Sequence, residues 1–559
     1  MKAPEELLSS ILKNEEKRIF NSSPYEDYIF PIVEIIRSLD YNTFVLSHKI
    51  DNKKDKQLLR KYKIGWTLPF KLFYEKLDLQ ERIPLFGFGT EERKWIDSII
   101  QYSETLQDVE RFLQFQKADL VSLSTTKEND FTFKFKLENG EYDHFDILSL
   151  NFYHKFIDEI IAKKYRKILN KIPEVRKKLK TIVSTYHEKF IQYKATEEID
   201  LFYRKLGYCY LMTTQVIDDF SETDSFGGIL YKDFLDIVEM IIKAAIMHRD
   251  CCMALSEKTN YKINLKDILS YHFDFDIFLK NCSNHFEWNI EKTEEILSCF
   301  MITKDNYNYH LNHPGAPISP YIKIGQNTII RSTFGAMDKP VFFLNRELKR
   351  KYRSDYDKNV NGREKRFRDQ VYSLFKETRL LVADGNPIIK ENGKFLTDID
   401  AALYDPSRKV LGLFQLKWQD PFGYSMKERF SKITNLIPKS VEWIDKIEAW
   451  VQTNSPKNIL NTCGFDFDKI EDVHLFIIAR HHINFSNQKL DERAIWASWY
   501  QMFEASAKVK DPTSSNPIGE LAAKLLFFSP QKRIERNEQV EIQESELKFS
   551  KYNIRIKKN

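Results

Sequence analysis

Apolar residues recur at helical spacing through most of the first 300 positions of the chain. In Phe30–Arg37 and Phe234–Lys243, isoleucine, leucine, valine and phenylalanine return every three or four residues. A stretch between Asp130 and Leu150 alternates more in the manner of a β-strand. The pattern predicts a mostly helical region over residues 1–312, suited to recognition of a substrate or to binding a partner.

The hydrophobic pattern changes after residue 312. Alternating residues in Tyr321–Arg331 flank the turn-forming Gly325–Asn327, which predicts a β-hairpin and makes residues 313–344 a hairpin connector. Helical and strand segments then alternate, which predicts an α/β domain over residues 345–510. The elements expected in it are a basic helix from Leu344 to Tyr352, a helix from Glu364, two strands, a long helix and the apolar strand Val473–Arg480.

The remaining residues, 511–559, are expected to form a linker, a short helix and a charged tail. The fold class expected for the whole chain is therefore α/β (α+β).

Composition narrows the class of protein further. Lysine and arginine number 86 against 81 acidic residues, and the formal charge of +5 is too small for a histone-like polyelectrolyte. The six cysteines form no C-x-x-C pair and no zinc-like spacing with histidine, so we expect reduced thiols in a cytoplasmic protein. We recognise neither a secretory leader nor an apolar stretch of membrane-spanning length, and expect no membrane association.

Two predicted strands in the C-terminal half carry polar side chains at matching positions. Phe395–Tyr404 and Val410–Trp418 alternate as strands on either side of a short turn. Side chains alternate between the two faces of a strand, so Asp398 shares a face with Asp400, and Gln415 shares one with Lys417.

The register of this hairpin decides which polar groups meet. If Tyr404 pairs with Leu411, Asp400 falls opposite Gln415, and Asp398 falls opposite Lys417. Burying such charges costs several kcal/mol unless they are paired or hold a metal ion. The hairpin is therefore a candidate site.

The helix predicted upstream adds another carboxylate. Phe367, Val371, Leu374 and Phe375 form its apolar stripe. Glu364 lies three residues before Phe367 and continues this stripe at the start of the helix, so we expect its side chain to point toward the sheet.

These residues resemble the pattern of the PD-(D/E)XK nuclease superfamily, which has a glutamate on its first helix, an aspartate on one strand and (D/E/Q)-x-Lys on the next. Glu364, Asp400 and Gln415–Lys417 match those positions, and the resemblance covers Asn345–Met502, under a third of the chain. Gln415 in place of the usual acidic residue is similar to Mrr-type domains, and Ile399 replaces the usual proline. The resemblance implies a restriction-endonuclease-like domain with a central mixed sheet flanked by helices.

The same resemblance implies phosphodiester hydrolysis that depends on Mg²⁺ or Mn²⁺. The ligands implied are Asp400, the Gln415 side-chain oxygen and the Leu416 carbonyl, with Glu364 completing the site or recruiting a second ion. Lys417 would orient the attacking water and stabilise charge on the phosphate. The implied substrate is nucleic acid, with DNA favoured over RNA.

Basic side chains near this constellation are candidates for contacts with a nucleic-acid backbone. Ser425–Glu428 is a capping box that opens the long helix, and this helix is expected to display Lys427, Arg429 and Lys432. For each of these three residues, a solvated basic face is an equally good explanation.

Three other basic groups stand out. Arg363 and Arg366 belong to a basic concentration beside the candidate site, for which we favour contact with substrate. Arg480–His482 ends the late strand, where contact with the substrate is one interpretation and a polar strand end is the other. Lys163–Lys171 and Arg176–Lys180 contain nine basic residues, which suit either phosphate binding or a solvated helix face.

Other catalytic motifs are incomplete. His248–Asp250 matches the letters of a kinase catalytic loop, but no glycine-rich loop or D-F-G accompanies it. His310 and His313 lack partners at zincin spacing, and no Walker A motif is present.

Two functions of different classes stay open. The first is a cytoplasmic Mg²⁺-dependent endonuclease, for which fold analogy suggests a restriction or phage-defence role. The second is a non-catalytic nucleic-acid-binding or assembly protein with the same fold. A homodimer or a partner subunit is compatible with either.

Overall fold

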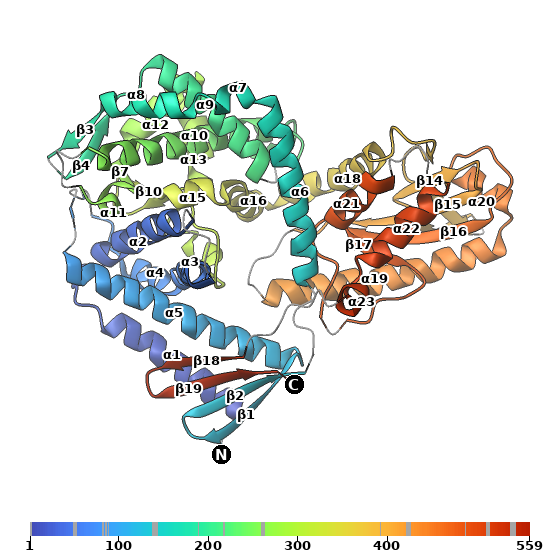
Figure 1. Cartoon of the computed structure of the whole chain (residues 1–559), viewed down its shortest axis with the longest axis horizontal. Helices are drawn as coiled ribbons and strands as arrows, with labels where there is room; N and C mark the ends of the chain where they lie inside the picture. Colours follow the sequence, from blue (N-terminus) through green and yellow to red (C-terminus); the bar gives the residue numbers. More distant parts are fainter. Residues whose placement is uncertain are drawn as a thin grey trace.

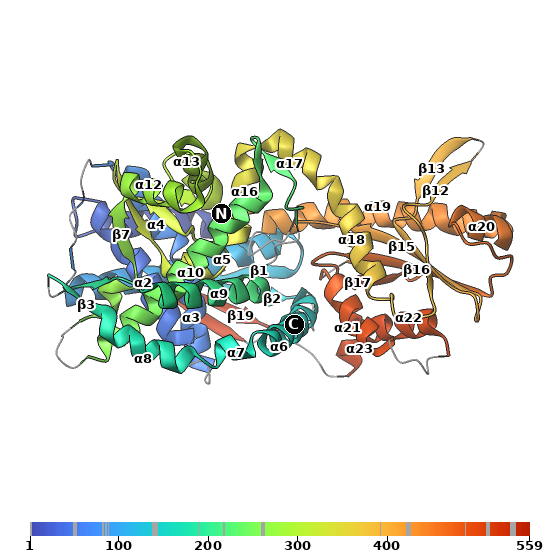
Figure 2. The ribbon, with the colours of Figure 1, turned by 90° about the horizontal axis from the view of Figure 1, so that it is seen from above.

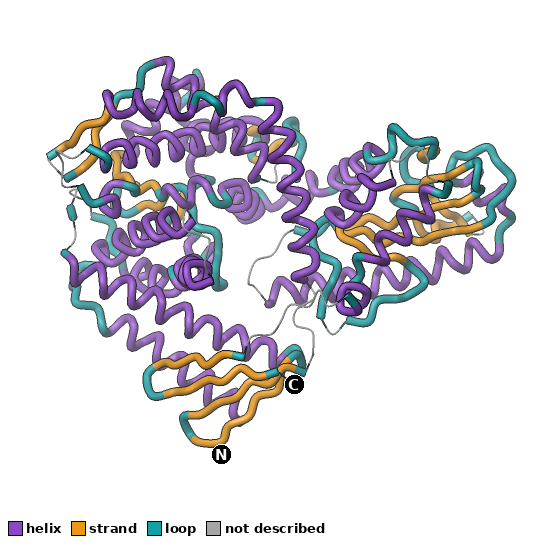
Figure 3. The backbone as a smooth tube through the Cα atoms, viewed as in Figure 1, coloured by secondary structure: helices purple, strands orange, loops and turns teal. Residues whose placement is uncertain are grey.

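The structure is a computed structural model that describes residues 3–47, 53–80, 83, 86–87, 89–136, 143–187, 189–215, 219–258, 263–391, 393–420, 426–486, 488–509, 515–536 and 544–558. Helices dominate, and the strands gather into several small sheets and one larger mixed sheet, so the expected α+β class is confirmed (Figure 3). Two parts are visible in Figure 1, which we call the helical body (residues 3–360 and 544–558) and the sheet lobe (residues 362–536).

The helical body contains most of the helices. They are α1 (Pro4–Asn21), α2 (Ile29–Ser47), α3 (Lys53–Gly65), α4 (Thr67–Lys76), α5 (Thr90–Lys117), α6 (Asp143–Lys164), α7 (Arg166–Leu169), α8 (Ile172–Ile182), α9 (Glu197–Thr214), α10 (Tyr231–Ser256), α11 (Leu265–Ile268), α12 (Phe275–Phe286), α13 (Ile290–Ser298), α14 (Tyr307–His310), α15 (Thr333–Met337), α16 (Pro340–Lys351) and α17 (Arg353–Val360).

The helical body also contains short strands. They are β1 (Val121–Lys127), β2 (Asp130–Phe135), β3 (Val183–Tyr186), β4 (Phe190–Tyr193), β5 (Ser225–Phe226), β6 (Ile229–Leu230), β7 (Tyr271–Asp274), β8 (Met301–Ile302), β9 (Tyr321–Lys323), β10 (Thr328–Arg331), β18 (Ser545–Phe549) and β19 (Tyr552–Lys557).

The sheet lobe alternates helices and strands. Its elements are α18 (Gly362–Ser373), β11 (Leu381–Val382), β12 (Ile388–Glu391), β13 (Lys394–Asp398), β14 (Ala401–Asp405), β15 (Val410–Lys417), α19 (Met426–Thr453), α20 (Pro456–Thr462), β16 (Asp472–Ala479), β17 (Ile495–Ser498), α21 (Trp499–Val509), α22 (Pro517–Phe527) and α23 (Pro530–Glu535).

The helical segments expected in the N-terminal half are confirmed. Phe30–Arg37 lies within α2 and Phe234–Lys243 within α10, and each helix lies at the centre of a buried apolar core. Of the strand expected between Asp130 and Leu150, the described residues form β2 and the start of α6, which begins at Asp143, and residues 137–142 lie outside the described part of the chain. In α6, Tyr153 packs against the rings of Tyr500 and Phe503 of α21, so tertiary contact supports a helix there.

The hairpin expected at Tyr321–Arg331 is present as β9 and β10. It is part of the core of the helical body, within a sheet of order β7-β10-β9-β8. Tyr321 and Ile329 face the α10 core, whereas Ile322 and Ile330 face the α2 core. The segment therefore joins two cores of the helical body, which differs from the expected role of a connector.

The C-terminal residues also differ from the expectation of a charged tail. Strands β18 and β19 form a hairpin, and β19 pairs in parallel with β2 to give a sheet of order β1-β2-β19-β18. Ile554 and Ile556 point inward and share a core with Phe131 and Phe133. The two ends of the chain therefore lie on the same side of the helical body (Figure 1).

This pairing makes the C-terminal hairpin a structural part of the helical body. Ile554 is fully buried, so Ile554→Ala is expected to lower the free energy of unfolding by about 2–5 kcal/mol. Arg555→Ala, at the neighbouring half-exposed position, is expected to change it by less than about 0.5 kcal/mol. Thermal unfolding of the two variants beside the wild type measures the difference, and equal midpoints for both would contradict the assigned packing.

A mixed five-stranded sheet forms the middle of the sheet lobe. Its order is β11-β14-β15-β16-β17, with β14 antiparallel to both β11 and β15, and with β15, β16 and β17 parallel. Helices α18, α21 and α22 cover one face, and α19 and α20 cover the other (Figure 2). Ile518, Leu521 and Leu525 of α22 complete the first core, so the lobe extends beyond residue 510.

None of the helices in the described part of the chain combines the length and the apolar character that crossing a bilayer requires.

Candidate active site

The strand pair β14–β15 has the predicted register. Tyr404 pairs with Leu411, and Ala401 pairs with Phe414. The backbone N–H of Asp400 continues the ladder by donating to the Phe414 carbonyl at 3.0 Å. Asp400 therefore lies beside Gln415, as the sequence pattern predicted.

The position of Asp398 differs from the prediction. Phe395–Tyr404 is not one strand, because the chain breaks between β13 and β14 and Asp398 pairs with Ile388 of β12. At the break, Ile399 is buried and its N–H donates to the Pro387 carbonyl at 2.9 Å. Asp398 is therefore not the cross-strand partner of Lys417.

The polar groups continue an otherwise apolar face of the sheet. Ala402 and Tyr404 of β14, and Leu411 and Leu413 of β15, pack under α19. Side chains on a strand repeat every second residue, so Asp400, Gln415 and Lys417 lie at the end of this same face.

Asp400 is the most buried acidic group of the constellation, with only 4% of its surface exposed. Its Oδ2 accepts a hydrogen bond from the backbone N–H of Leu416 at 2.6 Å and another from Nε2 of Gln415. Burial raises the pKa of Asp400 to about 6, although the Leu416 N–H and the charge of Lys417 oppose this change.

One side-chain oxygen atom of Asp400 and one of Gln415 are available to another partner. An ionised carboxylate has no proton to donate, so the Gln415 amide turns its nitrogen toward Asp400 and leaves Oε1 on its other side. Within the described residues, neither Gln415 Oε1 nor Asp400 Oδ1 accepts a hydrogen bond. Adjacent carboxylate and amide oxygens are the donor set of a hard divalent cation, so these side chains fit Mg²⁺ or Mn²⁺.

Lys417 is half-buried at the end of β15. Burial lowers the pKa of its ammonium group, while the charges of Asp400, Glu364 and Asp398 oppose that shift. In the part of the chain that the structure describes, no carboxylate lies within 4.0 Å of its Nζ. The charges of three acidic groups thus act on Lys417, but among the described residues its ammonium group forms an ion pair with none of them.

Helix α18 places Glu364 next to this group. The four residues of its predicted stripe, Phe367, Val371, Leu374 and Phe375, all lie in the core of the sheet lobe. Glu364 itself is exposed at the first turn, and its charge acts on Lys417.

Two further residues of α18 follow Glu364 at helical spacing and contact β14. Arg368 Nη1 donates to the Asp400 carbonyl at 3.5 Å, and the Tyr372 hydroxyl accepts from the Ala402 N–H at 3.1 Å. Arg368 and Tyr372 follow Glu364 by four and eight residues, and this helical spacing was a usable signal that sequence reasoning missed.

Arg363 and Arg366 do not face this site. Arg363 is only 3% exposed, and its guanidinium forms an ion pair with Asp420 at 2.7 Å. Arg366 Nη2 donates to the carbonyl of Asp219 at 2.8 Å, and its Nη1 lies 3.6 Å from the Asp224 carboxylate. Both side chains join α18 to the helical body, which corrects the expectation that they are presented to a nucleic acid.

The basic residues of α19 are placed unequally. Lys427 is exposed and Lys432 is half-buried, but Arg429 is buried, so the helix does not display it as expected. Ser425 of the expected capping box lies outside the described residues. Lys439, which the sequence analysis did not single out, is the α19 cation whose charge acts on Lys417.

The remaining basic groups are distributed between core and surface. Arg480 is buried, with its guanidinium 5.2 Å from the ring centroid of Trp418 and 5.5 Å from that of Trp499, and His481 is buried as well. Arg480 and His481 therefore stabilise the end of β16 from inside the lobe. The basic run of α6, α7 and α8 is largely exposed.

Comparison with protein-family models, with curated proteins and with solved structures finds no match for this chain. In the described residues, no group of three or more histidine, cysteine, aspartate or glutamate side chains is arranged to hold a metal ion. The candidate site is therefore defined by one buried carboxylate, one amide, one lysine and an exposed glutamate at the end of the mixed sheet.

Proposed function

We propose that the chain is a metal-dependent nuclease whose active site lies at the end of β14 and β15. The observation that carries this proposal is the pairing of Asp400 with Gln415, which leaves one oxygen of each side chain without a hydrogen bond among the described residues, beside an unpaired Lys417. A buried carboxylate with a raised pKa is costly for folding alone, and such groups concentrate at functional sites.

Each residue has a role that follows from its place. Asp400 and Gln415 would hold the cation through their remaining oxygens, the Leu416 carbonyl would contribute a main-chain ligand, and Glu364 would complete the set from α18. A bound Mg²⁺ or Mn²⁺ would supply Lewis-acid polarisation of the phosphate and a more acidic water. Lys417 would orient the attacking water and stabilise negative charge that develops on the phosphate oxygens.

The proposed substrate is nucleic acid, with DNA favoured over RNA. Lys439 on α19 and Arg368 on α18 provide cations near the site for the phosphate backbone. Lys427, exposed at the start of α19, is a further cation that we propose for backbone contact. A cytoplasmic enzyme in restriction or phage defence, acting as a homodimer or with a partner subunit, is the setting we propose by analogy.

A non-catalytic nucleic-acid-binding protein is the second candidate. Gln415 favours it, because an amide oxygen is a weaker ligand than a carboxylate for a hard cation, and Glu364 is exposed.

A cleavage assay separates the two candidates. The purified chain and its Asp400→Ala variant are incubated with plasmid DNA or a structured RNA in Mg²⁺, Mn²⁺ or EDTA. We expect cleavage only with a divalent ion and only by the wild type, with Asp369→Ala, an exposed acidic residue on α18, as the matched control. Nucleic-acid binding without cleavage under either metal would favour the non-catalytic candidate.

The raised pKa of Asp400 predicts a pH-dependent stability of the metal-free protein. Between pH values of about 4 and 6 the folded chain holds this proton more tightly than the unfolded chain, so stability falls as the pH rises through that window, by up to about 3 kcal/mol. Asp400→Asn removes the ionisation. In EDTA, its thermal midpoint is expected to exceed that of the wild type at pH 8, with a smaller gap at pH 4.5.

The control for this measurement is Asp369→Asn, whose side chain is exposed. A gap between Asp400→Asn and the wild type that does not change with pH would contradict the assigned environment of Asp400.

A further inference from the structure

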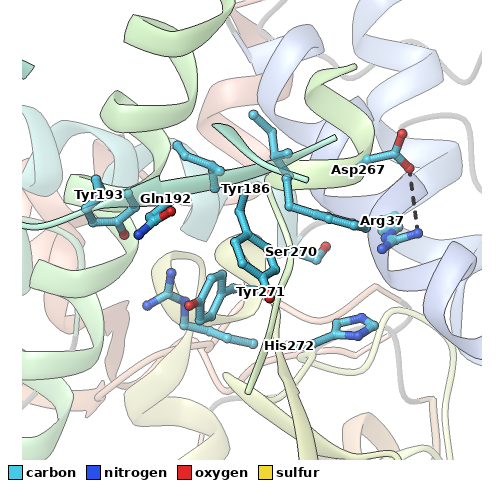
Figure 4. Close-up of a pocket in the computed structure, with 12 residues that line it drawn as sticks. Arg37, Tyr186, Gln192, Tyr193, Asp267, Ser270, Tyr271 and His272 are labelled. Atoms are coloured by element: carbon cyan, nitrogen blue, oxygen red, sulfur yellow. Dashed lines mark ion pairs between the residues drawn. The ribbon is translucent and has the colours of Figure 1, made fainter. Parts of the chain in front are cut away.

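A cavity of about 390 Å³ opens at the edge of the sheet to which β7 belongs. Its walls come from α2, the β3–β4 hairpin, α11, β7 and the end of β10. In Figure 4 the tyrosines Tyr186 and Tyr271 lie in the middle of the cavity, with Arg37 and Asp267 on one side and Gln192 and Tyr193 on the other. The volume lies within the range of roughly 300–1,000 Å³ found for small-molecule sites.

Arg331 is the unpaired cation of this cavity. It is the last residue of β10, is only 8% exposed and lines the cavity. In the register of β10 with β7, Arg331 pairs with Tyr271. In the described part of the chain its guanidinium forms neither an ion pair nor a hydrogen bond, and its Nε is buried without a partner. The Arg331 guanidinium lies 5.8 Å from the centroid of the Tyr271 ring. A buried guanidinium is costly unless an anion meets it.

The other charges around the cavity are already matched. Asp267 lies 3.6 Å from Arg37 and 2.5 Å from Arg93, and Lys266 lies 3.0 Å from Glu34 and 3.3 Å from Asp97, so three cations meet three carboxylates.

The nearby carboxylate of Asp40 is likewise engaged. It accepts hydrogen bonds from the hydroxyl groups of Ser270 and Ser332 and from the backbone N–H groups of Thr333 and Phe334. Among the residues that the structure describes, Arg331 therefore stands outside these pairs as a positive charge that no carboxylate neutralises.

The aromatic wall supplies the second half of the site. Tyr271 and Tyr186 are 41% and 46% exposed, so their rings are accessible from the cavity side. Tyr193 is held in place by a 3.0 Å hydrogen bond between its hydroxyl and Nδ1 of His248. Accessible rings of this kind stack on planar ligands, and nucleobases are the common example.

His272 adds an unsatisfied polar edge. It lines the cavity, it is buried, and neither ring nitrogen has a hydrogen-bond partner among the described residues. Burial and the charge of Arg37 lower the pKa of His272 to about 3, so the ring is neutral near pH 7 and offers one donor and one acceptor.

We propose that this cavity binds a nucleotide, with Arg331 meeting the phosphate, Tyr271 and Tyr186 stacking on the base, and His272 contacting a polar edge of the ligand. The combination of one surplus cation, accessible rings and an unsatisfied donor and acceptor matches a phosphorylated aromatic compound better than a simple anion or an acidic peptide. The same chemistry is available from a free mononucleotide and from a base turned out of a nucleic-acid strand. The inference is independent of the proposed nuclease site.

Calorimetric titration of the full chain in EDTA tests the proposal. The probes are AMP, GMP, CMP and dTMP, with adenosine and inorganic phosphate as half-ligands and a short single-stranded oligonucleotide as the strand-derived source. At least one mononucleotide is expected to bind more tightly than both half-ligands. Arg331→Gln should weaken binding about tenfold or more, and Tyr271→Leu about fivefold or more.

Two matched variants serve as controls. Lys189→Gln removes an exposed charge from the β3–β4 hairpin without touching the cavity wall, and Tyr271→Phe keeps the ring. Both are expected to bind as the wild type does, and thermal unfolding verifies that every variant is folded.

The outcomes separate the two sources from each other and from failure. Binding of mononucleotides that depends on Arg331 and Tyr271 supports a free nucleotide. Binding of the oligonucleotide alone, with the same dependence, supports a base from a strand. The proposal is overturned if the folded protein binds neither the mononucleotides nor the oligonucleotide at millimolar concentration. It is also overturned if Arg331→Gln and Tyr271→Leu both bind as the wild type does, or if phosphate alone binds as tightly as the nucleotides.

Discussion

Lys417→Ala is expected to slow cleavage of nucleic acid by at least about a hundredfold, because removal of one group that stabilises developing charge costs about 10²–10³ in rate. Lys417 is the cation closest in sequence and in strand position to the Asp400–Gln415 pair. Its ammonium forms no ion pair among the described residues, so it is available to a phosphate oxygen or an attacking water. The initial rate of plasmid or RNA cleavage measures the effect.

The control is a lysine in the turn just before the same strand. Lys409→Ala removes a partly exposed ammonium that pairs with Glu471 at 3.1 Å, and is expected to leave the rate within about twofold. Binding of Mn²⁺ is expected to raise the thermal midpoint of the wild type. The same rise in Lys417→Ala would show that the loss lies in chemistry and not in ion binding. Equal rates for Lys417→Ala and the wild type would remove Lys417 from the proposed site.

Arg363→Ala is expected to destabilise the protein by about 3–5 kcal/mol, because it breaks a buried ion pair and leaves its partner charge behind. Arg363 pairs with Asp420 at 2.7 Å and donates to the Asp219 carbonyl at 3.1 Å. Its guanidinium also lies 4.5 Å from the ring centroid of Phe220.

The pKa of Asp420 supports the same expectation of destabilisation. Burial alone would raise the pKa of Asp420, but the charges of Arg363, Lys349 and Lys432 outweigh burial and hold that pKa well below its usual range. The carboxylate therefore stays ionised in the variant while its strongest partner is missing.

Thermal unfolding and limited proteolysis between α17 and α18 measure the consequence for the junction of the two parts of the chain. The control is Arg353→Ala, which removes an exposed arginine that pairs with Asp357 at 2.8 Å and is expected to cost less than about 1 kcal/mol. If Arg363→Ala instead weakens nucleic-acid binding without changing stability, the original expectation of substrate contact would be restored.

Parts of the site were predictable because they are local. Asp400 and Gln415 lie 15 positions apart across one short turn, and alternation along two strands was enough to place them side by side. The apolar stripe of α18 was predictable for a similar reason, since helical spacing alone selects the buried face.

Other parts depended on contacts between distant segments. Alternation cannot say which sheet a strand joins, so the break that sends Asp398 to β12 was hidden within one apparently continuous strand. Charge composition in the same way concealed the C-terminal hairpin, whose Asn553 lies 423 positions from its hydrogen-bond partner Asp130.

The sequence by itself thus determined the α+β class, the long amphipathic helices and the register of the β14–β15 hairpin, because periodicity and a short turn specify each of them locally. Only the tertiary structure decided which basic residues are free and which are buried, as the contrast between Lys417 and Arg363 shows. A side chain's charge follows from its residue type, but its solvent exposure and its partners depend on segments that fold against it from elsewhere in the chain.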